Sequence, residues 1–193
     1  MHDLEMKYIQ EAFDTNWVAP LGKNVDEFEK EMASYIGVKH AAALNSGTAA
    51  LHLAVKLADI KKDDVVLCSD LTFSATVNPV SYEGGRQVFI DAEEETWNMD
   101  PKALEKALKK YPNTKAVIIA HLYGTPAKLD EIKALTDYYN VPLIEDAAES
   151  LGSTYKGKQT GTFGRLSVLS LVVLKNRTSD SYTGIRSGGP KAA

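Results

Sequence analysis

Three carboxylates follow an apolar run in the segment from Val141 to Ser150. Asp146 stands where we expect a buried strand to end, and an ionised carboxylate is costly to bury unless a cation or a hydrogen-bond donor faces it. A protonated ring nitrogen, an arginine or a metal ion would meet that need. The metal is the weakest choice, because no histidine or cysteine lies close by in sequence. The competing interpretation is a carboxylate that caps a neighbouring helix.

Phosphate binding is the chemistry expected around Gly47 and Thr48, where an apolar run turns directly into a helical pattern. Free amides at a helix N-terminus, the positive end of the helix dipole and a glycine that permits close approach all suit a phosphate. The alternative is an ordinary helix start, in which Ser46 or Thr48 bonds only its own backbone. Phe73 follows the next apolar run, and its ring either stacks on a planar ligand or belongs to the core.

Lys175 ends the apolar run that begins at Ser167. A lysine amine becomes a nucleophile when its surroundings lower its pKa, but Lys175 is equally the first polar residue after a buried run. Ser170 precedes it by five residues. In an extended strand the two side chains would point to opposite faces, about 16 Å apart, so one ligand touches both only if the chain turns between them.

The elements that must position these residues alternate along the chain. Two amphipathic helices come first, and in the second we expect Asn24 as the cap and Gly37 as the left-handed stop. A tight turn is expected at Lys156-Gly157-Lys158. Buried strands are predicted from apolar runs at about 39–44, 64–68, 86–90, 115–120 and 141–145, with a further run at 166–174, and helices at about 47–58, 74–83, 101–110 and 127–139.

This alternation predicts an α/β fold with a mostly parallel sheet and helices on both faces. Ligands bind such sheets at the carboxyl ends of the strands, which is where the candidate residues fall. With 193 residues and 44% hydrophobic side chains, the chain can form one large domain. The sequence contains neither the glycine-rich motifs of dinucleotide and nucleoside triphosphate binding nor the serine motif of hydrolases. The H-E-x-x-H metal-binding motif is also missing.

Composition narrows the choice of partners and compartment. The net charge is -4 with no basic stripe, so we expect no nucleic acid partner. No apolar run approaches the roughly 20 residues that span a bilayer, and the start of the sequence lacks a signal-peptide pattern. The single cysteine, Cys68, excludes a disulfide within the chain, fits a reducing cytoplasm and is expected to be a small buried hydrophobe.

Several segments together resemble the DegT/DnrJ/EryC1/StrS family of sugar aminotransferases. These enzymes use pyridoxal 5'-phosphate (PLP) on the aspartate-aminotransferase fold, fold type I of PLP enzymes. The matching segments occur in family order over residues 5 to 170, and they are Asn16 to Gly22, Asn45 to Leu51, His121 to Gly124, Ile144 to Gly152 and Gly161 to Gly164. His121 lies in one of them, and we expect it to be structural.

The resemblance implies a role for each candidate residue. Amides around Gly47 and Thr48 would hold the cofactor phosphate, and Phe73 would stack on the pyridine ring. Asp146 would pair with the pyridinium nitrogen. Glu149 would lie near the 3-oxygen of the ring, at a position where the family more often has glutamine or histidine. Ser170 would add a hydroxyl to the phosphate site. Lys175 would bond the cofactor and move the proton.

The chain departs from the family after Ser170. Leu171-Val172-Val173-Leu174 replaces the usual turn before the lysine, and we expect the small C-terminal domain of the family to be missing. We therefore expect residues 1–175 to contain two N-terminal helices and an incomplete PLP-binding large domain. Residues 176–193 are expected to form a disordered tail.

The reaction that the resemblance implies is amino transfer from an amino acid, usually glutamate, to a nucleotide-linked keto-sugar. A UDP-4-keto-6-deoxy-N-acetylhexosamine is the preferred acceptor, and a cytoplasmic homodimer is the expected form. Two alternatives stay open. One is a truncated, non-catalytic protein that binds PLP or a partner, and the other is a PLP-dependent sugar dehydratase, which typically carries histidine in place of the lysine.

Overall fold

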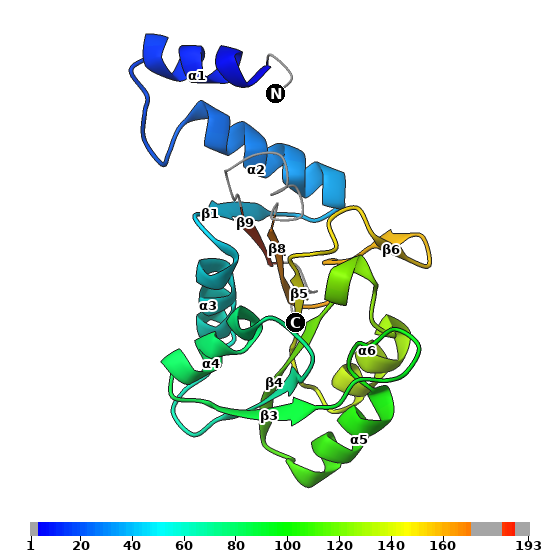
Figure 1. The fold of residues 1–193 in the computed structure, drawn as a ribbon. Coiled ribbons are helices and arrows are strands. Elements are labelled where there is room, and N and C mark those ends of the chain that lie inside the picture. The colour runs from blue at the N-terminus through cyan, green and yellow to red at the C-terminus, as the bar shows by residue number, and fades with distance from the viewer. Residues whose placement is uncertain (1–3, 171–182, 188–193) are drawn as a thin grey trace.

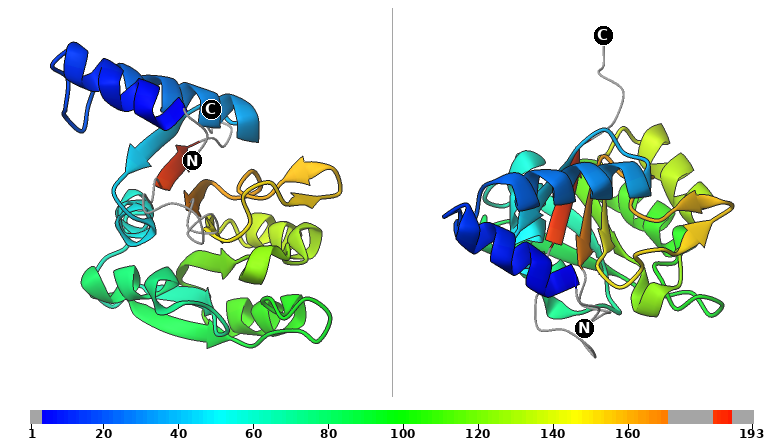
Figure 2. Two further views of the ribbon diagram at one scale, coloured as in Figure 1. Left: turned by 45° about the horizontal axis from the view of Figure 1, so that its top comes forward. Right: turned by 90° about the horizontal axis from the view of Figure 1, so that it is seen from above.

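A computed structural model describes residues 4–170 and 183–187 of the chain (Figure 1). Two helices come first, α1 (Leu4–Asp14) and α2 (Lys23–Ile36). They lie on the β1 side of the sheet, and α1 contributes no buried residue (Figures 1 and 2). In contrast to α1, α2 packs against the sheet domain through the buried Ile36, which clusters with Ala147 and Leu169.

The second helix ends as predicted and begins differently. Gly37 adopts the left-handed conformation at φ 81°, and its amide donates to the last turn of α2. The predicted Asn24 cap was wrong, because Asn24 lies inside the first turn and donates to the carbonyl of Tyr8 at 3.5 Å. The chain enters the helix at Gly22, at φ 127°, where a Cβ would lie 2.0 Å from the ring of Trp17.

A mostly parallel sheet forms the centre of the domain, as predicted, and the described residues contribute seven strands to it. Its order is β1-β9-β8-β5-β4-β2-β3, and only β9 runs antiparallel to its neighbours. The strands are β1 (Ala41–Leu44), β2 (Val65–Ser69), β3 (Arg86–Ile90), β4 (Thr114–Ala120), β5 (Leu143–Ala147), β8 (Leu166–Ser170) and β9 (Thr183–Ser187).

One further prediction concerns the turn at 156–158, and one structural feature, the strand β9, was not predicted. The expected tight turn is present, since Lys156 and Gly157 take positive φ angles of 50° and 79° between β6 (Thr154–Tyr155) and β7 (Lys158–Gln159). Within the tail expected at 176–193, the described residues Thr183–Ser187 form the strand β9. This strand is held by backbone pairing with both β1 and β8, which hydropathy does not reveal.

Helices cover both faces of the sheet (Figure 2). One face carries α3 (Gly47–Leu57), η1 (Ser74–Thr76) and α4 (Asn78–Tyr82). The other face carries α5 (Pro101–Lys110) and α6 (Leu129–Tyr138), and the short η2 (Leu122–Gly124) follows β4. The single helix predicted at 74–83 was wrong, because Pro79 has no amide hydrogen to donate back to the preceding turn.

Two apolar layers that the sheet separates form most of the core. Val66 and Cys68 of β2 pack with α3 and α4, whereas Leu67 packs with α5 and α6. Cys68 is fully buried, and burial raises the pKa of its thiol to about 12. It is therefore a small core residue, as predicted, rather than a reactive thiolate.

Candidate functional site

Asp146 lies at the carboxyl end of β5, between β4 and β8. In register it faces Ala120 on one side and Val168 on the other. The Thr76 hydroxyl donates to its Oδ2 at 2.6 Å, and the Ala148 amide donates to its Oδ1 at 3.1 Å.

This carboxylate is 8% exposed, and burial raises its pKa, although the bonds from Thr76 and Ala148 oppose the rise. Within residues 4–170, where side chains are described, no cation pairs with Asp146. Asp146 is therefore a buried carboxylate that accepts two hydrogen bonds and that could also pair with a cation.

The N-terminus of α3 reaches the same edge of the sheet. Ser46 caps the helix by accepting from the Ala49 amide at 3.1 Å, so the ordinary helix-cap interpretation is correct for the Ser46 side chain. Gly47 lies beside the end of β8, since a Cβ on it would be 3.8 Å from Ser170 Cβ and 3.9 Å from Ser170 Oγ. The structure thus brings the positive end of α3 next to Ser170.

Ser170 is 2% exposed, and its hydroxyl has no hydrogen-bond partner within the described parts of the chain. Leaving a buried hydroxyl unpaired costs about 1–3 kcal/mol, so such an atom calls for an explanation. An anion at the start of α3 would supply one. The backbone amides of Gly47 and Thr48 precede the capped amide of Ala49 and lie at this end of the helix.

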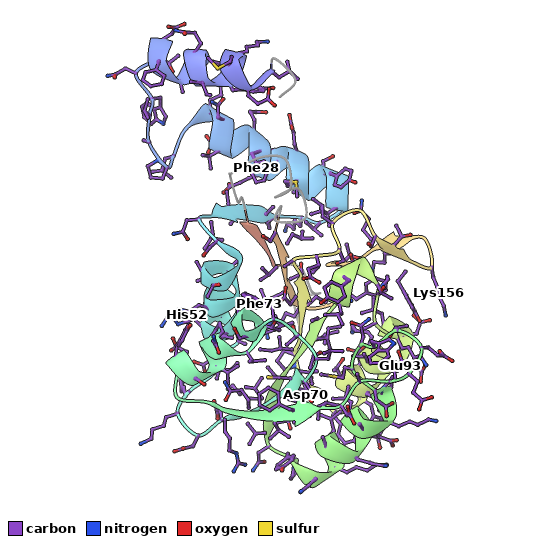
Figure 3. All side chains as sticks on the ribbon, in the orientation of Figure 1. Phe28, His52, Asp70, Phe73, Glu93 and Lys156 are labelled. Carbon is purple, nitrogen blue, oxygen red and sulfur yellow. The ribbon has the colours of Figure 1, made fainter. Side chains whose placement is uncertain are left out.

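Phe73 begins the η1 turn that delivers Thr76 to Asp146, and its label in Figure 3 lies on the loop before α4. It is 74% exposed, so the interpretation of Phe73 as a core residue was wrong. Glu149 lies close enough to Asp146 for like-charge repulsion to add, less than burial does, to the raised pKa of Asp146. Its Oε2 accepts from the Tyr123 amide at 2.6 Å. Lys175 lies outside the described residues.

A buried polar pair next to Asp146 was not recognised from the sequence as part of the site. His121 Nε2 lies 3.1 Å from Glu145 Oε2, and both side chains are fully buried. Glu145 also accepts hydrogen bonds from the loop at 161–164. The signal was available, because Glu145 and Asp146 are neighbours on a strand and must face opposite sides of the sheet.

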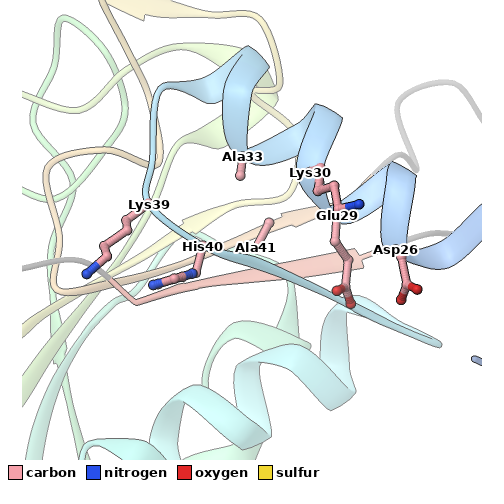
Figure 4. A pocket seen from close by; sticks show the side chains of 7 residues that line it. All are labelled: Asp26, Glu29, Lys30, Ala33, Lys39, His40 and Ala41. Atoms are coloured by element: carbon pink, nitrogen blue, oxygen red, sulfur yellow. The ribbon is translucent and has the colours of Figure 1, made fainter. Parts of the chain in front are cut away.

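A separate cavity of about 300 Å³ lies between α2 and β1 (Figure 4). None of the candidate residues lines it. Glu29, one of its lining residues, accepts from the Ala43 amide of β1 at 2.8 Å. The lining side chains mix both charges and are those of Asp26, Glu29, Lys30, Ala33, Lys39, His40 and Ala41.

Among the described residues, no helix combines the length and the apolar character that a membrane crossing needs. Nor do these residues contain a group of three or more histidine, cysteine or acidic side chains placed to hold a metal ion.

Residues 1–180 match the model of the DegT/DnrJ/EryC1/StrS aminotransferase family. EpsN of Bacillus subtilis (strain 168), whose name describes a pyridoxal phosphate-dependent aminotransferase, is 55% identical over 174 residues. That match covers 88% of this chain and 45% of EpsN. A UDP-4-amino-4,6-dideoxy-N-acetyl-beta-L-altrosamine transaminase of Campylobacter jejuni (strain 81-176) is 44% identical over 159 residues, which cover 82% of this chain and 42% of the relative.

A solved structure is also similar. The aminotransferase from Psychrobacter cryohalolentis superposes with a TM-score of 0.90 at 31% identity, covering 98% of this chain and 48% of its own. The predicted α/β fold of PLP aminotransferases is thereby confirmed. The chain spans about half the length of the proteins that it matches.

Proposed function

Because the chain belongs to the DegT/DnrJ/EryC1/StrS aminotransferase family, we propose that it serves PLP-dependent amino transfer from glutamate to a nucleotide-linked keto-sugar. The proposed acceptor is a UDP-4-keto-6-deoxy-N-acetylhexosamine. Amination of its 4-keto group gives the kind of UDP-linked 4-amino-4,6-dideoxy sugar that the name of the Campylobacter relative contains. A cytoplasmic homodimer is part of this proposal. Since the chain spans less than half of that relative, the activity is proposed for the full-length protein.

The Ser170 hydroxyl, which has no hydrogen-bond partner among the described residues, carries the proposal. It lies buried beside Gly47 at the start of α3, where a side chain is missing and the helix dipole is positive. A phosphate group at this point would accept from Ser170 and from the amides of Gly47 and Thr48. The residues present therefore fit the phosphate of PLP.

Asp146 fits the ring nitrogen of the cofactor. A cation beside a carboxylate lowers the pKa of that carboxylate, so a protonated ring nitrogen would offset the cost of burying the Asp146 charge. Thr76 and Ala148 hold both oxygens in place for this contact. Bound PLP supplies an electron sink for the substrate amino acid, and Asp146 holds the proton on the ring nitrogen that this chemistry needs.

The remaining roles complete the proposed site. Phe73 is exposed and could stack on the ring, and Glu149, which accepts from the Tyr123 amide, would lie near the 3-oxygen. Lys175 would bond the cofactor and move the substrate proton, and its spacing of five residues from Ser170 supports this role.

Borohydride trapping tests the proposal directly. We expect PLP to give a visible absorption band with the wild-type chain, and sodium borohydride to fix the cofactor onto the peptide that contains Lys175. The Lys175→Ala variant should give no such adduct, as judged by mass spectrometry of the digested protein. The same adduct on another lysine in that variant would exclude Lys175.

Product analysis decides between the candidate reactions. Glutamate and the UDP-linked keto-sugar should yield 2-oxoglutarate and an amino sugar with the full-length protein. A deoxygenated product without a new amine would favour the dehydratase instead, and bound PLP with no product would favour a non-catalytic protein.

Ser170→Ala should separate cofactor affinity from stability. The buried hydroxyl has no described partner, so its loss should leave the free energy of unfolding of the cofactor-free chain unchanged or higher. The dissociation constant of PLP should rise about tenfold, because one hydrogen bond to a charged phosphate is lost. Ser69→Ala is the matched control, since its buried hydroxyl accepts from the Ala120 amide. That control should lose stability and retain PLP affinity, and the reverse pattern would contradict the phosphate role of Ser170.

A further inference from the structure

The buried pair of His121 and Glu145 has no part in the proposed chemistry, yet it adjoins the site. Glu145 precedes Asp146 on β5, and the two side chains point to opposite faces of the sheet. Asp146 contacts Thr76 on one face, and Glu145 contacts the loop at 161–164 on the other. One strand end thus holds two carboxylates with different surroundings.

The hydrogen bonds fix the protonation of this pair. The Ala127 amide donates to His121 Nδ1 at 3.2 Å, so that nitrogen carries no proton. The proton is therefore on Nε2, which donates to Glu145 Oε2 at 3.1 Å. The ring orientation and the tautomer of His121 are therefore set by contacts on both sides.

Glu145 is an ionised carboxylate surrounded by donors. Its oxygens accept from the amides of Gly161 at 2.9 Å, of Phe163 at 2.7 Å and of Gly164. Burial opposes the charge, but the bonds from His121 and from these amides outweigh burial and hold the pKa of Glu145 below its ordinary value. Four donors thus converge on one side chain.

The loop that Glu145 holds leads directly into β8. Ser167 of β8 faces Glu145 in the parallel register and donates to the carbonyl of Gly161 at 2.7 Å. The same strand ends at Ser170, beside Gly47. Any displacement of the loop would therefore be passed to the strand that carries the unpaired hydroxyl.

We propose that Glu145, held in place by His121, is a positioning residue that fixes the loop at 161–164 and thereby the carboxyl end of β8 at the phosphate side of the site. This inference rests on the proposed function, because it assigns the positioned Ser170 to the cofactor phosphate. Neither Glu145 nor His121 touches the reacting atoms.

Nuclear magnetic resonance of the cofactor-free chain tests the pair itself. At pH 7 the nitrogen shifts of His121 should show a neutral ring protonated on Nε2, and the amide protons of Gly161, Phe163 and Gly164 should exchange slowly with solvent. A charged imidazole ring, or one protonated on Nδ1 alone, would overturn the proposed arrangement. This measurement is independent of PLP.

Glu145→Gln tests the positioning role. Glutamine offers one acceptor oxygen, so at least one of the four donors would face its amide group. Amide exchange should rise at least tenfold at Phe163 and at Ser170, and the dissociation constant of PLP should rise about tenfold. His121→Phe removes one donor and keeps a ring of similar volume, and it should shift both quantities in the same direction by a smaller factor.

Leu108→Ala is the matched control. Leu108 is buried in α5 on the same face of the sheet and belongs to the apolar cluster there, so its truncation lowers stability without removing a bond to the loop. If this variant and Glu145→Gln lose PLP affinity in equal proportion to their fall in Tm, Glu145 is merely structural and the inference is wrong. If the full-length protein binds no PLP, the proposed function fails, whereas exchange at Ser170 still decides whether Glu145 positions β8.

Discussion

Asp146→Asn is expected to weaken PLP binding and to stabilise the cofactor-free chain. A hydrogen bond between charged groups contributes about 1.5–3 kcal/mol, so losing the contact with the ring nitrogen should raise the dissociation constant of PLP roughly 10- to 100-fold. The buried contacts survive, because the side-chain amide of the introduced asparagine can donate to Thr76 while Thr76 donates to Thr72, whose hydroxyl lies 2.7 Å away.

The stability change follows from the raised pKa of Asp146. Its pKa in the folded chain exceeds the ordinary value of 3.8, so the folded state binds more protons than the unfolded state between these two pKa values. Stability of the cofactor-free wild type should therefore fall as the pH rises from 3.8 through the raised pKa. The asparagine variant lacks this group and should lose this part of the pH dependence.

Urea unfolding from about pH 4 to 8, the range above the ordinary carboxyl pKa, and a PLP titration followed by absorbance measure the two effects. Asp70→Asn is the control, since Asp70 is an exposed carboxylate just after β2 (Figure 3). It should change neither quantity. A cofactor-free Asp146→Asn chain that is less stable than wild type at the alkaline end of this range would contradict the assignment of Asp146 as an uncompensated buried charge.

Gly164→Ala is expected to cause the largest loss of stability. A Cβ at this position would lie 2.8 Å from the carbonyl oxygen of Leu143 and 2.9 Å from that of Leu166. Both oxygens are backbone atoms of strands, so neither can move away without disturbing the pairing of β5 with β8. We expect a loss of about 3 kcal/mol in the free energy of unfolding, the upper end for overpacking.

Gly157→Ala is the control for this prediction. Gly157 has φ 79°, but a Cβ there would meet no atom within 4 Å. Its substitution should cost only about 1–2 kcal/mol of left-handed backbone strain. Thermal unfolding of both variants makes the comparison, and equal losses would show that the close approach to β5 and β8 does not restrict position 164.

The sheet and most helices were predictable from the sequence because their signal is local. Residues such as Val66 and Leu67 belong to runs that are apolar on both faces, which is typical of a covered parallel sheet. The start of α2 near Asn24 and the break in the predicted helix at 74–83 were not predicted correctly. Each depends on a single residue, whose effect the apolar periodicity of the segment does not show. The strand β9 depends on neighbours far away in sequence, so no local pattern indicated it.

The candidate site was predictable to a similar degree. Its residues were proposed because strand ends and helix starts converge in a parallel sheet. The structure brings Gly47 to Ser170, and it adds Thr76, which the sequence did not single out, as a donor to Asp146. The role of Glu145 was not found, because its partners at 161–164 are identified only by their backbone amides. Side-chain types carry no information about such contacts.

The bond from the Ala43 amide to Glu29 has a consequence for solubility. The strand β1 is the last of the sheet, and an edge strand with free amides is a template onto which another chain can add a strand. Glu29 occupies one of these amides with a charged group, so an incoming strand would have to displace a carboxylate before it could pair. A single acidic side chain of α2 thus occupies one of the donors at the border of the sheet that strand addition would need.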